Sequence, residues 1–368
     1  MLFIGAACLT LAVARGERET ASMVETSPAW QVTETAQFTA GYSDNLMLSP
    51  FAPLAGAFGE AGAEALLLGS IRPGWELSAF VQGNHRHYQH PDPEVRDESG
   101  WFSRLESRWQ PQQRLSLSLV LAAFGENSIS DLSETEASRL VIPARLRGGS
   151  AGLSTRLDLS ARVALRLSAR RMRTDYLNLS GDHDGLEQRA QVEWLVSPRL
   201  TAGVEWKELR RDYADRPQYT AGGRPLNGTR LSFWRAGGEA SLTLQLDTDG
   251  RQRLTLTAGE SMNRDRSSGY FNVNQRHAGL RFHWSAGRWD VTCEGLLRQE
   301  NYSVQTGGTG IAPPLRHSRQ LQAGLHAERM LTRHWSVIAT VDHDHDRGNL
   351  AEFTYAANTA GIGLKCTF

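Results

Sequence analysis

The sequence contains no long hydrophobic run. None of its apolar stretches approaches the ~18 consecutive residues that a membrane-spanning helix needs, so a helical membrane protein is excluded. Neither sign of charge is in excess: 40 lysines and arginines balance 40 aspartates and glutamates, and the formal net charge is zero. Such a chain has no overall field to attract nucleic acid, and we expect no nucleic-acid partner.

Cysteine is scarce, with three residues in 368. Cys8, Cys293 and Cys366 are too far apart for a metal-binding spacing, and we expect no structural disulfide. The densest group of other metal ligands is 342–346, which reads Asp-His-Asp-His-Asp. On a strand the aspartates face one way and the histidines the other, so they could share an ion only if the strand bent. We therefore predict no metal and no cofactor, with a bent metal site as the alternative.

Alternation of apolar and polar residues is abundant. It begins at 30–42, where Trp30, Val32, Phe38 and Tyr42 share one face, and it recurs to the end of the chain. Residues that share a face of a strand lie two apart, so this period predicts strands with one apolar side. The clearest apolar faces are Leu115, Leu117, Leu119 and Leu121; Val163, Leu165 and Leu167; Leu242, Leu244 and Leu246; and Ala278, Leu280, Phe282 and Trp284.

The connections between these strands alternate in length. Short turns are expected at 72–74, 111–113, 197–199, 247–250 and 286–288, and longer loops at 43–60, 89–100, 127–149, 177–185, 214–228, 264–272, 303–315 and 348–352. Soluble sandwiches and propellers do not sort their connections in this way, whereas transmembrane barrels do. We predict an all-β fold: a single transmembrane antiparallel up-and-down β-barrel of about 16 strands, with short periplasmic turns and long external loops. Tryptophans beside the short turns suit an aromatic girdle: Trp75, Trp109, Trp194, Trp289 and Trp335.

The chain divides into three parts. Residues 1–14 end in Ala12-Val13-Ala14 and are predicted to be a signal peptide, truncated or atypical because no basic residues precede its apolar run. A lipoprotein signal ending at Cys8 is the alternative. Residues 15–29 form a polar N-terminal linker, and residues 30–368 form the barrel.

The last strand alternates up to a terminal aromatic residue. Gly363, Cys366 and Phe368 resemble the glycine, hydrophobic and final aromatic positions of the C-terminal sorting signal of bacterial outer-membrane β-barrels. Gly361 departs from that signal, which usually has a polar residue there. The resemblance implies a Gram-negative outer membrane and insertion by the barrel assembly machinery. The alternative is an amphipathic last strand of a soluble sandwich.

A second resemblance lies at 41–46, which reads Gly-Tyr-Ser-Asp-Asn-Leu. It is similar to a signature after the first strand of the β-barrel porin 2 group, which includes barrels from exopolysaccharide loci. The match covers six residues and the general strand pattern. It implies an outer-membrane barrel of porin type, tied in some members to polysaccharide export.

The strand faces opposite the apolar ones are charged. So many ionised groups would be costly in a dry core, so we expect a water-filled lumen. The expected pore-lining bases are Arg104, Arg108, Arg156, Arg162, Arg166, Arg170, Arg189 and Arg235, and the acids are Asp290, Glu294, Glu328 and Asp342. Arginine dominates 101–190 and carboxylates dominate 290–346, which in a closed barrel gives a field across the bore. In the alternative, the charges pair between strands and fill the lumen.

The third external connection is expected to be the longest. It carries Asp131, Glu134 and Glu136, and it resembles the third loop of general porins in order, length and charge. That resemblance implies that it folds inward and narrows the channel.

The predicted function is passive diffusion of small hydrophilic solutes through an outer-membrane porin-like channel. The main alternative is a barrel component of exopolysaccharide export or surface assembly, and a third is a structural barrel with a filled lumen. Outer-membrane enzymes use Asp/His or Ser/His pairs, but no spacing here singles out a catalytic residue, and we predict no enzyme. Expected partners are outer-membrane lipid and lipopolysaccharide, the assembly machinery, small solutes and, as in many sixteen-stranded porins, two further copies in a homotrimer.

Overall fold

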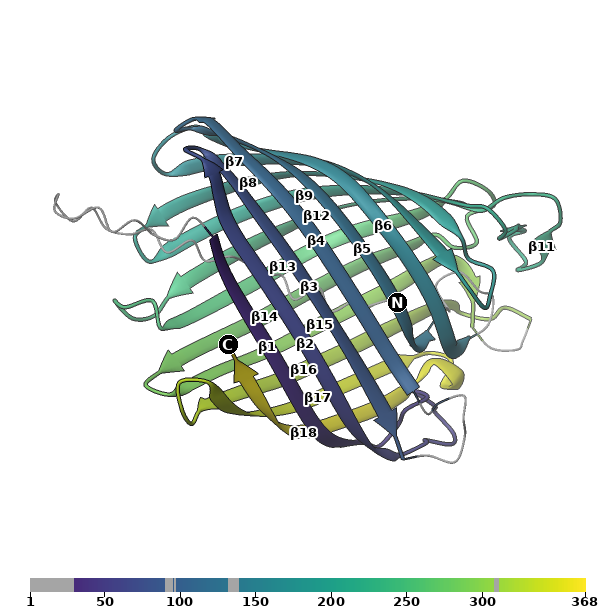
Figure 1. Ribbon diagram of the computed structural model, residues 1–368. Helices are drawn as coiled ribbons and strands as arrows, with labels where there is room; N and C mark the ends of the chain where they lie inside the picture. The colour runs from purple at the N-terminus through teal and green to yellow at the C-terminus, as the bar shows by residue number, and fades with distance from the viewer. Residues whose placement is uncertain (1–29, 90–94, 96, 132–138, 308–310) are drawn as a thin grey trace, which may run out of the picture.

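The chain folds into a closed β-barrel. The computed structural model describes residues 30–89, 95, 97–131, 139–307 and 311–368. Sixteen strands pair antiparallel with their neighbours around the ring, as predicted (Figure 1). They are β1 (Trp30–Ser43), β2 (Gly56–Arg72), β3 (Trp75–Tyr88), β4 (Asp97–Gln112), β5 (Leu115–Asp131), β6 (Val141–Asp158), β7 (Val163–Tyr176), β8 (His183–Ser197), β9 (Leu200–Tyr213), β12 (Ser232–Gln245), β13 (Gln252–Asp265), β14 (Val273–Ala286), β15 (Trp289–Thr306), β16 (Leu315–Met330), β17 (Trp335–Gly348) and β18 (Tyr355–Thr367).

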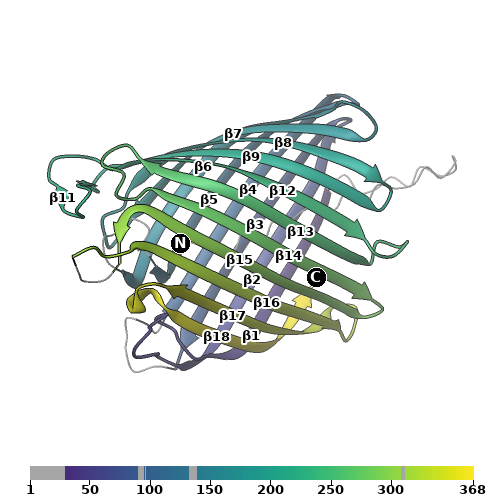
Figure 2. The ribbon, with the colours of Figure 1, turned by 180° about the vertical axis from the view of Figure 1, so that it is seen from behind.

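Short turns join the strands at one rim and longer loops at the other. Figure 2 shows the two rims from behind, with the small β10 (Gln218–Tyr219) and β11 (Pro225–Leu226) hairpin standing out from the loop rim. The sorting by length therefore agrees with the prediction. Within the described chain no helix is long and apolar enough to cross a membrane.

The third external loop is shorter than predicted. β5 and β6 continue to pair up to Asp131↔Val141, so the connection between them is 132–140 rather than 127–149. The longest external connection is instead 214–231, which contains the β10–β11 hairpin. Apolar and polar residues stop alternating where both faces of a strand are exposed to water. A prediction from this alternation therefore underestimates how far a strand extends beyond the membrane.

The barrel closes between its first and last strands. β1 and β18 pair from Thr35↔Thr367 to Ser43↔Thr359, and the Phe368 amide donates to the Glu34 carbonyl at 2.9 Å. Two residues of the 41–46 motif hold the outer end of this seam. The Asp44 carboxylate accepts hydrogen bonds from the amide and side chain of Asn358, and the buried Asn45 side chain donates to the carbonyl oxygens of Ser49 and Ala356. The motif thus fastens the first loop over the seam.

The apolar face of each strand points outward. Leu119, Leu242 and Leu280 keep 46%, 48% and 45% of their surface exposed, which a protein in water would not tolerate over a whole belt. Trp109, Trp194, Trp289 and Trp335 are also exposed, beside the short turns. An apolar belt with aromatic residues at its edge matches the chemistry of a lipid bilayer and its interface.

Two clusters of buried apolar side chains lie near the loop rim in the part of the chain that the structure describes. One cluster joins Tyr213, Leu231, Phe233 and Phe271, where 214–231 packs on 266–272. The Asp265 carboxylate orders the 266–272 loop by accepting hydrogen bonds from three backbone amides within 267–271. A smaller cluster consists of Leu46, Phe58 and Tyr88.

Candidate functional site

The charged faces of the strands line the inside of the barrel. Ion pairs that skip a strand show this: Arg156 on β6 reaches Glu193 on β8 at 3.1 Å, and Glu328 on β16 reaches Lys365 on β18 at 3.0 Å. Neighbouring strands are about 4.8 Å apart, and only on a concave face do side chains of alternate strands converge. The polar faces are therefore concave and inward, and the leucine faces are convex and outward.

Nearly all of the predicted pore-lining residues lie on this inward face. The register places together, on the face opposite the leucines, the following residues: Arg104, Arg108, Arg156, Arg166, Arg170, Arg189, Arg235, Asp290, Glu294, Glu328 and Asp342. Arg162 is the exception. It lies in the exposed turn before β7, because the strand begins one residue later, at Val163. Its role in lining the bore stays a prediction.

One carboxylate organises the basic wall. Glu187 on β8 is almost fully buried, and its oxygens lie 3.0 Å from Arg170, 2.9 Å from Arg189 and 2.9 Å from Lys207. Each of those cations keeps about two fifths of its side chain exposed. The wall therefore carries three solvated cations around one shielded anion.

The acidic wall is less compensated. Glu294 pairs with Arg281 at 3.0 Å and Asp290 approaches His283 at 3.6 Å, while Asp344 accepts from Gln320 and from the Tyr355 hydroxyl. The carboxylates are centred on β16, which is fourth in the ring order from β1 through β18, and the arginines on β6, which is twelfth. Eight of sixteen places separate them, so the two walls face each other across the bore.

The β6 end of the third external loop contacts residues near the β1–β18 seam. Arg139, at its β6 end, donates a hydrogen bond to the Leu48 carbonyl, and its guanidinium lies 5.2 Å from the Tyr355 ring on β18. β18 and β6 lie six places apart in the ring, so this contact crosses part of the opening. Asp131 is the last residue of β5, whereas Glu134 and Glu136 lie outside the described residues.

A recess of about 410 Å³ hollows the wall formed by β2 to β5. Its floor is one row of paired residues, Gln37, Gly62, Asn84, Gly100 and Glu126, in which two positions have no side chain. A Cβ at Gly62 would lie 3.2 Å from the Gln37 side chain, and one at Gly100 would lie 3.0 Å from the Asn84 oxygen. The glycines thus leave space that any larger residue would fill.

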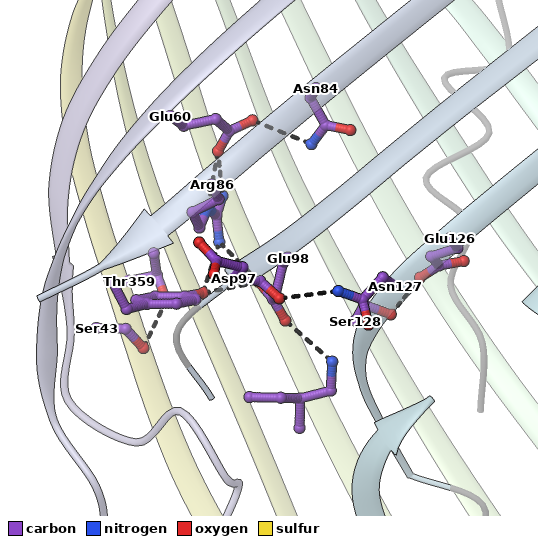
Figure 3. Close-up of polar contacts among 12 residues, drawn as sticks. Ser43, Glu60, Asn84, Arg86, Asp97, Glu98, Glu126, Asn127, Ser128 and Thr359 are labelled. Carbon is purple, nitrogen blue, oxygen red and sulfur yellow. Dashed lines mark hydrogen bonds and ion pairs between the residues drawn. The ribbon is translucent and has the colours of Figure 1, made fainter. Parts of the chain in front are cut away.

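A network of hydrogen bonds holds the outer edge of this recess (Figure 3). The Arg86 guanidinium binds Glu60 at 2.6 Å and lies 3.9 Å from Glu98. Glu98 also accepts from the Tyr88 hydroxyl at 2.8 Å and from the Ile129 amide at 3.0 Å. These contacts fix the edge as a rigid rim.

Sequence reasoning missed the recess. The connection predicted over 89–100 contains Glu98, which the structure places in β4, and the alternation gives no separate signal for the lumenal faces of β2 and β3. Glu60, Gly62 and Glu64 alternate on one face of β2, and that pattern could have marked the wall. The hollow itself needs the pairing of Gly62 with the residues two strands away.

The remaining sequence candidates form no second site. Asp344 and Asp346 lie on the inward face of β17, and His343 and His345 on the outward face, as the alternation predicts. No group of three or more possible ligands able to hold a metal ion occurs among the described residues. Cys293 and Cys366 are free thiols. At the C-terminal signal, Cys366 is buried and Phe368 is exposed.

Comparison with known proteins places the fold. No family model matches the sequence, and no curated protein matches it. Three solved structures share the architecture: OccAB3 and OccAB1 of Acinetobacter baumannii, and OpdK of Pseudomonas aeruginosa solved with vanillate. The first two are each 7% identical, cover 92% of this chain and 98% and 96% of their own, and have TM-scores of 0.52. OpdK is 8% identical, covers 91% of this chain and 99% of its own, and has a TM-score of 0.51.

The chain has the outer-membrane porin fold. Combined with the exposed leucine belt, this fold makes the protein an integral outer-membrane β-barrel. The identity is far too low for any residue of those porins to be matched to one here, so the porin fold specifies the scaffold. The chemistry of the lumen must be argued from this chain.

Proposed function

We propose that the barrel is a channel for passive diffusion of small hydrophilic solutes. The proposal rests on the hydration of charged side chains inside the barrel. The side chains of Arg104, Arg170 and Arg281 point inward, yet they are 47%, 41% and 53% exposed. A filled lumen would bury such groups, paired or not. Barrels of this strand number also have room for water between their walls.

The opposed walls supply the selectivity of the proposed channel. Arg156, Arg170 and Arg189 stand on one side, and Asp290, Glu294 and Asp342 on the other, so the bore carries a transverse field. A polar solute aligns its dipole with this field and gains interaction energy, whereas an apolar solute only loses hydration. The channel therefore favours hydrophilic molecules without selecting strongly by net charge.

The third loop narrows the mouth in this proposal. Arg139 ties the β6 end of the loop to Leu48 and Tyr355 near the β1–β18 seam, and Asp131 lies at its other end. Neutralising Asp131, Glu134 and Glu136 to amides is expected to shift ion selectivity toward anions, because three negative charges leave the narrow zone. Unchanged reversal potentials in a planar bilayer would contradict this role for the loop.

Single-channel recording of the purified protein tests the function itself. We expect stepwise conductance in KCl and swelling of proteoliposomes in isotonic sugar. A barrel that inserts, shown by resistance of its strands to protease, but neither conducts nor passes sugars would show that the lumen is closed and would refute the channel.

A further inference from the structure

The β2–β5 recess has a different chemistry from the two opposed walls. Its charged lining consists of four carboxylates, Glu60, Glu64, Glu98 and Glu126, against the single guanidinium of Arg86, a formal charge of −3. The Arg86 guanidinium forms ion pairs with Glu60 and Glu98. Within the described chain, Glu64 has no ion pair, and Glu126 accepts only from the Ser128 hydroxyl at 2.5 Å. The recess therefore holds two carboxylates that no cation among the described residues neutralises.

The rest of the lining suits hydroxyl groups and a carbon skeleton. The side-chain amides of Gln37, Gln82 and Asn84 each offer both donors and an acceptor. Phe102 and Phe124 lie next to each other in the row on the periplasmic side of the glycines, and Phe80 packs on Phe102 with ring centroids 6.3 Å apart. Planar amides for hydroxyls and a phenyl surface for C–H groups are the groups that bind a sugar ring.

We propose that this recess is a binding site for protonated amino sugars. The ring hydroxyls bind the amides, the C–H face lies against the phenyl surface, and the ammonium group lies between Glu64 and Glu126. A volume of about 410 Å³ is at the lower end of small-molecule sites and holds one or two sugar rings. The inference deepens the proposed channel function, because it names a solute class and the wall that selects it.

The test measures glucosamine binding to the detergent-solubilised barrel by saturation-transfer NMR. The variant Glu64→Gln/Glu126→Gln keeps the shape of the lining and removes both free charges. We expect its dissociation constant for glucosamine to rise about tenfold, since each lost contact with the ammonium is worth a few-fold at a hydrated site. N-acetylglucosamine has the ring without the charge, and ethanolamine the charge without the ring; both should bind wild type about tenfold more weakly than glucosamine.

Two control variants separate the recess from the rest of the lumen. Glu205→Gln removes an inward carboxylate of β9 without a described ion pair, and it should change the constant less than twofold. Gly100→Val fills the floor without changing charge and should abolish saturable binding. Gly324→Val on β16, where a Cβ also meets side chains at 3.2 and 3.3 Å, should not.

Each outcome decides one of the two proposals. Equal binding of glucosamine and ethanolamine, or equal effects of Glu205→Gln and the double variant, would overturn the amino-sugar site. In that case a measured conductance would still support the channel. Glucosamine binding that depends on Glu64 and Glu126 in a protein without conductance would keep the site and refute the channel.

Discussion

The closing seam depends on the absence of a side chain at Gly363. A Cβ built there lies 2.3 Å from the Phe38 carbonyl oxygen and 3.0 Å from the Thr39 Cα, both in the backbone of β1. Backbone atoms cannot rotate away as a side chain can. Valine at this position must therefore push β18 away from β1 by roughly 1 Å to reach ordinary van der Waals contact.

That displacement breaks hydrogen bonds of the seam. Moving a bond of about 2.9 Å by roughly 1 Å takes it beyond hydrogen-bonding distance, and one antiparallel pair contains two such bonds. Each buried backbone group left unsatisfied costs about 1–3 kcal/mol, so we expect Gly363→Val to destabilise the barrel by about 2–6 kcal/mol. This is a large part of the total stability of most proteins.

Gly295→Val is the matched control. It lies in the middle of β15, and a Cβ there meets nothing closer than the Gln322 carbonyl at 3.9 Å. Gly295 faces lipid and Gly363 faces the lumen, and valine changes strand preference by up to about 1 kcal/mol at either position, so a larger loss at Gly363 reports the seam. Thermal unfolding in detergent, followed by circular dichroism, should show a clearly lower midpoint for Gly363→Val alone. Equal midpoints for the two variants would refute the close-approach argument.

Three further predictions concern the belt, the basic wall and the third loop. Leu119→Arg places a charge in the lipid-facing belt and should cost about 2–4 kcal/mol in urea unfolding from vesicles, with wild-type stability as the contradicting result. Glu187→Gln removes the carboxylate that three lumenal cations share, whereas Glu193→Gln leaves Arg156 paired with Asp158; the first should shift the reversal potential further toward anion selectivity, and equal shifts would disprove the shared-carboxylate arrangement. Arg139→Gln removes the contact of the third loop with Tyr355 and should increase open-channel current noise, whereas the exposed Arg224→Gln should not. Unchanged noise in Arg139→Gln would mean that this contact does not hold the loop.

The sequence by itself determined the fold class. Leu115 to Leu121 face lipid on every second position, and the connections alternate between short and long, because both features are local consequences of a strand that crosses a bilayer. The same alternation correctly assigned the aspartates and histidines of 342–346 to opposite faces. It failed at the outer strand ends, where both faces are exposed to water, and so overestimated the length of the third loop.

Only the tertiary structure decided what the lumen contains. Gly62, Asn84 and Gly100 come from three strands, and they form one floor because the register aligns them. Arg139 contacts Tyr355 more than two hundred residues away, and Gly363 meets β1 because the ring closes. Register, curvature and closure are properties of the whole barrel, and no local pattern in one strand records them.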